Sequence, residues 1–268
     1  MKKIYLICLL FSISAVADYQ KITVSTKFYS EGSAYGDING DGINDLVTGS
    51  FWWEGPKYRK KYQIRELDGS RGPTPVSRDA YIPLKYSNSF INWVRDINND
   101  GKNDILIVGL PGTALKAYLN PGAKDGKWQE LILWDVVDNE SPQLLDIDGD
   151  GNEELICNYD GYFGYAKMNP AKPLEKWTFH KVSAKGTWFK YTHGIGIGDV
   201  NNDGRMDMLA GHGWLEQPAN AKLGEEWIFH EHQFSNGEHH CGAQMFAYDV
   251  DGDGKNDVIT SGNAHGYG

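Results

Sequence analysis

The chain has 268 residues, of which 32 are glycine and 13% are aromatic, and its formal net charge is −10. The charge argues against a nucleic acid or an anionic membrane surface as the partner. The composition is typical of turns and packed strands rather than of disorder.

The chain begins with a segment that reads as a secretory signal peptide. Residues 1–17, MKKIYLICLLFSISAVA, combine two early lysines, an apolar run and a small-x-small end. We expect cleavage near Ala17, a domain over residues 18–268, and a secreted or periplasmic protein. No later segment has the roughly 18 to 20 apolar residues that cross a bilayer, so no membrane insertion is expected. Cys157 and Cys241 then remain, and we expect two thiols.

An acidic nonapeptide occurs five times after this segment. The five copies read DINGDGIND from Asp37, DINNDGKND from Asp96, DIDGDGNEE from Asp146, DVNNDGRMD from Asp199 and DVDGDGKND from Asp249. They start 59, 50, 53 and 50 residues apart, which indicates one supersecondary unit used repeatedly.

Each unit carries the same elements in the same order. A Gly-rich or alternating run leads into the acidic loop, an apolar β-type run leaves it, and a turn with proline follows; in the middle units Trp128, Trp177 and Trp227 then open another strand. We attribute these tryptophans to packing between units. The pattern predicts an all-β fold, a β-propeller of about 50-residue, four-stranded blades. Because the fifth unit stops after two strands, we expect a fragment of a larger ring, for example a seven-bladed one, rather than five blades that close imperfectly.

The acidic loops have the donor set of a calcium site. Positions 1, 3, 5 and 9 carry oxygen side chains and position 6 is glycine, as a tight all-oxygen loop requires. An EF-hand is disfavoured because its position 12 is a glutamate, whereas these loops have Thr, Ile, Cys, Ala and Thr there. Metal-free acidic turns would crowd carboxylates without compensation. We expect up to five structural Ca²⁺ ions, held by Asp37, Asn39, Asp41, Asp45, Asp96, Asn98, Asp100, Asp104, Asp146, Asp148, Asp150, Glu154, Asp199, Asn201, Asp203, Asp207, Asp249, Asp251, Asp253 and Asp257.

These loops resemble the FG-GAP/VCBS repeats of integrin-α-like propellers. The resemblance covers the chain from about Asp18 to its end, and it implies the propeller fold and calcium binding while saying little about function, since such propellers serve adhesion, ligand binding and catalysis.

A second set of residues is predicted at the end of the propeller opposite the loops, beside the channel mouth. The candidate catalytic residues are His193, His212, His239 and His265, and the candidate substrate-binding residues are Trp53, Trp214, Glu216 and His240. Histidines can transfer protons near neutral pH, and an aromatic, polar funnel suits a sugar. The alternative is that the histidines are structural and that Glu216, which has the same offset from its loop as Glu54, shapes a turn.

Two functions remain open at this stage. The phrases HGIGIGDVNNDGRMDML, GWLEQP and AHGYG resemble the propeller of aldos-2-ulose dehydratase-like proteins, which implies a carbohydrate dehydratase or lyase. The alternative is a non-catalytic module for adhesion that binds a glycan or a protein partner.

Overall fold

The computed structural model describes residues 20–66, 74–75, 86–186, 188, 190–234, 242 and 244–262. The predicted signal peptide, His239, His240, Cys241 and His265 lie outside these residues. Within the described ranges no helix is long and apolar enough to cross a membrane.

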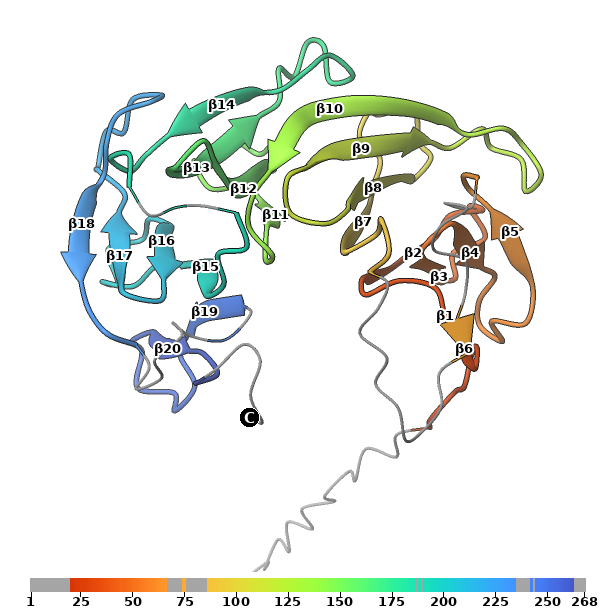
Figure 1. Ribbon diagram of the computed structural model, residues 1–268, viewed down its shortest axis with the longest axis horizontal. Helices are drawn as coiled ribbons and strands as arrows, with labels where there is room; N and C mark the ends of the chain where they lie inside the picture. The colour runs from red at the N-terminus through yellow and green to blue at the C-terminus, as the bar shows by residue number, and fades with distance from the viewer. Residues whose placement is uncertain are drawn as a thin grey trace, which may run out of the picture.

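Three antiparallel four-stranded sheets and one six-stranded sheet follow one another around an arc (Figure 1). In each of the four sheets, four consecutive strands pair antiparallel in sequence order, and each such set of four is one blade. The blades are β2 (Ser33–Gly36), β3 (Asp45–Thr48), β4 (Phe51–Trp53) and β5 (Lys61–Gln63); β7 (Ile91–Arg95), β8 (Asp104–Val108), β9 (Thr113–Leu119) and β10 (Gln129–Val137); β11 (Gln143–Leu145), β12 (Glu154–Tyr159), β13 (Tyr162–Lys167) and β14 (Thr178–Lys181); and β15 (Ile195–Gly198), β16 (Asp207–Ala210), β17 (Gly213–Glu216) and β18 (Ile228–Glu231).

A fifth unit contributes two described strands, β19 (Gln244–Tyr248) and β20 (Asp257–Ile259). β19 pairs in parallel with β15, which joins the fifth unit to the fourth sheet. The two backbones approach so closely that a Cβ on Gly196 would lie 2.2 Å from the Met245 carbonyl oxygen. A glycine at residue 196 is therefore required for this contact. A separate two-stranded pair links β1 (Lys27–Phe28) to β6 (Thr74–Pro75).

The core lies between neighbouring blades. The second strands β8, β12 and β16 are almost entirely buried, because blades pack on both of their faces. Trp128, Trp177 and Trp227 are only 6%, 3% and 6% exposed. Each belongs to the hydrophobic cluster that its own blade shares with the blade before it. Their predicted role in packing is confirmed, as is the all-β propeller-blade architecture.

The acidic loops all join the first strand of a unit to the second, at one end of the blades. Ties between successive units join the blades at this end. The contacts, from one unit to the next, are Asn103 Nδ2 to the Asp37 carbonyl oxygen at 2.7 Å, Arg95 Nε to Glu153 Oε2 at 2.5 Å, Gln217 Nε2 to the Ile147 carbonyl oxygen at 2.8 Å, and Asn256 Nδ2 to the Asp199 carbonyl oxygen at 2.7 Å.

Candidate functional site

The five acidic loops share one backbone conformation. In every loop the position-1 carboxylate accepts hydrogen bonds from the backbone N–H groups of positions 5 and 6, and the position-5 carboxylate accepts one from position 7. The residues at positions 4 and 6 have positive φ, which explains why position 4 is always glycine or asparagine. The backbone thus curls around the side-chain oxygens of positions 1, 3 and 5.

The acid at position 9 starts the second strand and is fully buried in the first four units. One oxygen of Asp45 accepts from the Ile38 N–H at 2.9 Å, and the other accepts from the Gly55 N–H at 2.8 Å. Asp104 and Asp207 are held in the same way by the residue that follows the third strand. These carboxylates therefore tie the loop to two strands.

Burial of the position-9 carboxylates has an electrostatic cost. Burial raises the pKa of Asp104 and of Asp207 to about 6. The hydrogen bonds that each carboxylate accepts from backbone N–H groups lower the pKa, but they offset only part of this rise. Nearby loop acids add repulsion in the same direction as burial. A cation bound in the loop would relieve both effects.

Two of the loops bring three carboxylates together without rearrangement. One oxygen from each of Asp249, Asp251 and Asp257 lies within 4.8 Å of the others, and the same holds for Asp146, Asp148 and Glu154. All the donors are oxygens, which is the set that calcium prefers. The residues present therefore fit a calcium ion by their chemistry. The third loop differs because a lysine side chain also lies among its acids.

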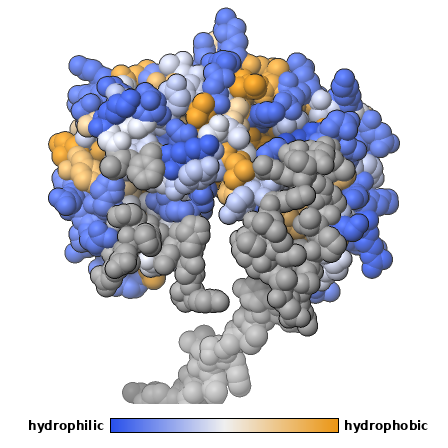
Figure 2. All heavy atoms as spheres, in the orientation of Figure 1, coloured by the Kyte–Doolittle hydropathy of each residue, from blue (hydrophilic) through white to orange (hydrophobic). Residues whose placement is uncertain are grey.

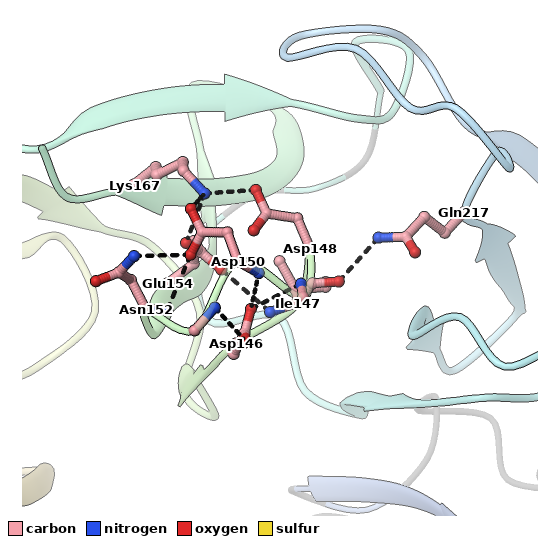
Figure 3. A network of polar contacts seen from close by, with 10 residues as sticks. Asp146, Ile147, Asp148, Asp150, Asn152, Glu154, Lys167 and Gln217 are labelled. Atoms are coloured by element: carbon pink, nitrogen blue, oxygen red, sulfur yellow. Dashed lines mark hydrogen bonds and ion pairs between the residues drawn. The ribbon is translucent and has the colours of Figure 1, made fainter. Parts of the chain in front are cut away.

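In the third loop a lysine reaches the acids (Figure 3). Lys167 Nζ lies 2.5 Å from Asp148 Oδ2, 2.7 Å from Asp150 Oδ2 and 3.1 Å from Glu154 Oε1. The repeat pattern does not predict this lysine, although its own unit carries a signal. Only here is position 9 a glutamate rather than an aspartate.

The candidate substrate-binding residues do not gather at the end opposite the loops. Asn201 Nδ2, in the fourth loop, donates to Glu216 Oε1 at 3.3 Å, and His230 Nε2 lies 2.6 Å from Glu216 Oε2. Glu216 therefore sits at the acidic-loop end, which corrects the expectation that it lies with His212. The chain turns back after β16, and β17 carries Glu216 to the other end of the blade.

The other two described members of this set are engaged in packing. Trp214 stacks on His230 with ring centroids 4.3 Å apart. Trp53 is buried and has an edge contact with Tyr29, with centroids 5.7 Å apart. Trp53 consequently offers little surface to a ligand.

The two described catalytic candidates have protein neighbours. The His212 ring lies 5.2 Å from the Trp188 ring and 5.3 Å from the Phe229 ring, so it belongs to an aromatic cluster. His193 Nδ1 lies 3.6 Å from Glu140 Oε2.

A groove that the sequence pattern does not predict lies between the first and second blades. Its volume is about 520 Å³. Its walls are the residues after β5, the β9–β10 turn and the adjoining faces of those strands: Gln63, Ile64, Arg65, Glu66, Tyr118, Lys124, Asp125, Gly126, Lys127, Trp128 and Glu130. Only the assembly of two blades creates it, so no motif within one repeat could have revealed it.

The groove is organised by polar and aromatic contacts. The Arg65 guanidinium lies over the Tyr118 ring, 5.7 Å from its centroid, and donates through Nη2 to the Asn88 carbonyl oxygen at 2.9 Å. Tyr118 donates its hydroxyl to Glu130 Oε2 at 2.8 Å. At the rim, Lys124 Nζ pairs with Glu54 Oε1 at 2.8 Å. These contacts fix the positions of charged donors and acceptors around the groove.

Comparison with known proteins supports the repeat assignment. The FG-GAP-like repeat family model matches residues 96–157 and 146–210, so this part of the chain consists of FG-GAP-like repeats. No curated protein matches the sequence significantly.

Two solved structures are similar in part. One describes specific recognition of non-reducing terminal N-acetylglucosamine by an Agrocybe aegerita lectin, with 14% identity and a TM-score of 0.45 over 84% of this chain and 59% of that one. The other is the V. cholerae biofilm matrix protein Bap1, with 21% identity and a TM-score of 0.37 over 63% of this chain and 27% of that one. The chain thus spans less than two thirds of either protein, and neither alignment is close enough to transfer a binding specificity.

Proposed function

We propose that this chain is a secreted, calcium-stabilised β-propeller that binds carbohydrate in the groove between its first two blades, without breaking a bond in it. The observation that carries the proposal is the groove itself. Its volume falls within the range of roughly 300 to 1,000 Å³ that is usual for small-ligand sites.

The chemistry of the groove suits a sugar. Arg65, Lys124 and Lys127 supply donors, and Glu66, Asp125 and Glu130 supply acceptors, so the two signs of charge balance. A polyanion would want an excess of cations, whereas a hydroxyl-rich ligand uses donors and acceptors alike. The face drawn in Figure 2 mixes hydrophobic with hydrophilic residues.

Calcium has a structural part in this proposal. Position-1, position-3, position-5 and position-9 side chains of a loop would hold the ion, and the bound ion supplies positive charge that offsets clustered carboxylates. The loops lie at the end of the blades where side chains of one unit bond to the next. Calcium bound in the loops would therefore make the arc of blades, and the groove between the first two, more rigid.

The dehydratase hypothesis has less support. Its described histidines, His193 and His212, are engaged by Glu140 and by the Trp188 and Phe229 rings. A general base or acid must reach the proton that it transfers, so a histidine fixed in an aromatic cluster is a weak candidate.

The groove is tested by removing a lysine that lines it. Lys127 is exposed at the position before Trp128, and Lys176 is the equivalent residue before Trp177 in the next blade. We expect the wild type and Lys176→Ala to retain the same sugars on an array of neutral and acidic glycans. Lys127→Ala should bind the best of them roughly threefold to tenfold more weakly by calorimetry. Equal affinities in both variants would place the binding elsewhere, and an unsaturated sugar product would revive the dehydratase hypothesis.

A further inference from the structure

We infer that the third acidic loop, residues 146–154, is completed by the Lys167 ammonium group and takes no calcium ion. This inference rests on the proposed calcium binding of the other loops. Composition alone would rank the third loop as the strongest calcium site, because it contains more acids than any other. The inference is the opposite.

Lys167 contacts three carboxylates of the third loop. Its Nζ lies within 3.1 Å of an oxygen from positions 3, 5 and 9 of the loop. Figure 3 shows the ammonium between these side chains. The Lys167 side chain is only 16% exposed, so solvent screens these contacts less than those of a surface pair.

The position-9 acid of the third loop has a different hydrogen-bond donor from its equivalents in the first, second and fourth loops. In the first, second and fourth loops its second oxygen accepts a hydrogen bond from a backbone N–H one or two residues after the third strand, that of Gly55, Asn120 or Gln217. In the third loop the corresponding oxygen of Glu154 accepts from Lys167 Nζ instead. The third unit thus differs from the first, second and fourth units at two positions. It has glutamate instead of aspartate at position 9 of the loop, and it has a lysine on the third strand that contacts this glutamate.

The register of the third strand places Lys167 beside the position-9 acid. Lys167 follows Ala166, the partner of Leu155, and therefore stands opposite Glu154. The same register puts Glu54, Leu119 and Glu216 opposite the position-9 acids of the other three complete blades. Among the described blades, a cation occupies this position only in the third.

Loop cations elsewhere differ from Lys167 in geometry. Lys102 and Arg205 occupy position 7 of their own loops, and each pairs with the position-5 acid alone. They leave positions 1, 3 and 9 to another cation. Lys167 instead uses three of the four side chains that would coordinate calcium. An ion at the usual 2.3 to 2.6 Å from these oxygens would be in direct contact with the ammonium.

The test counts calcium ions on the full secreted chain by equilibrium dialysis with radioactive calcium. Two matched double variants remove the position-3 and position-5 acids, Asp148→Asn with Asp150→Asn in the third loop and Asp251→Asn with Asp253→Asn in the fifth. We expect the third-loop variant to bind as many ions as the wild type and the fifth-loop variant to bind one fewer. Loss of an ion from the third-loop variant would overturn the inference.

A second arm removes the lysine. Lys167→Met should bind one ion more than the wild type, melt at a lower temperature in chelator, and recover in calcium. Lys102→Met is the control and should change neither quantity to a comparable extent. An unchanged ion count for Lys167→Met would contradict the inference. If no variant binds calcium, the calcium proposal fails. The inference is then decided in chelator, where Lys167→Met must destabilise the protein more than Lys102→Met does.

Discussion

The third and fourth blades have the same strands and the same loop backbone, yet they place opposite charges at one equivalent position. Lys167 stands opposite Glu154 in the third blade, and Glu216 stands opposite Asp207 in the fourth. The lysine contacts three loop acids, whereas Glu216 adds a carboxylate beside Asn201. A repeat can therefore keep its backbone while one side chain reverses the charge that faces its loop.

Removal of calcium should have the largest effect, and it should affect the two blades differently. A chelator should lower the melting temperature of the protein and expose the fourth blade to hydrogen exchange before the third. Each lost ion costs about 2.7 kcal/mol of unfolding free energy when free calcium is 100-fold above its dissociation constant. Peptide-resolved hydrogen exchange with and without chelator measures this. Equal loss of protection in β12 and β16 would remove the contrast between the blades.

Reversing the charge of the residue opposite the position-9 acid should make the fourth blade behave like the third. Glu216→Lys places an ammonium against the fourth loop, so we expect one fewer bound calcium ion and, in chelator, a gain of about 1 kcal/mol in the free energy of unfolding. Calorimetric titration and chemical denaturation check both expectations. Glu54→Lys makes the same substitution in the first blade. If neither variant changes the number of bound ions or the free energy of unfolding, strand register alone does not bring a lysine into contact with the loop acids.

The tie between the second and third loops should have a smaller effect. Arg95 donates through Nε and Nη2 to both oxygens of Glu153, at 2.5 and 2.8 Å, but both side chains are partly exposed. We expect Arg95→Met to lower the free energy of unfolding by about 0.5 to 1 kcal/mol, in chelator and in calcium alike. Urea denaturation in both conditions measures it. A loss that appears only with calcium would connect this tie to the ions instead.

The smallest effect should be seen at Cys157, which lies on β12 in the third blade. Complete burial raises the pKa of its thiol, so the reactive thiolate is scarce. In a Cys241→Ser background we expect alkylation of Cys157 to stay slow even in chelator, because we infer that the loop of its blade holds no calcium ion that a chelator could remove. Mass spectrometry of the labelled protein follows the rate. Fast labelling after chelation would indicate that the third blade opens with the others.

The sequence determined the repeat, the strand order and the loop donors, because each of these is encoded within one unit. Apolar runs on either side of an acidic loop specify two antiparallel strands wherever they occur. Glycine or asparagine at position 4 and glycine at position 6 specify the loop backbone. The spacing of Trp128, Trp177 and Trp227 likewise predicted their packing.

Only the tertiary structure decided what faces each loop and what lies between blades. Lys167 is 13 residues from Glu154 in sequence and reaches it through the register of β12 and β13. Glu216 was assigned to the wrong end because β17 reverses direction after its turn. The groove needs Arg65 from one blade and Tyr118 from the next. These contacts depend on how separate elements pack, and a pattern that repeats within each unit carries no information about its neighbour's side chains.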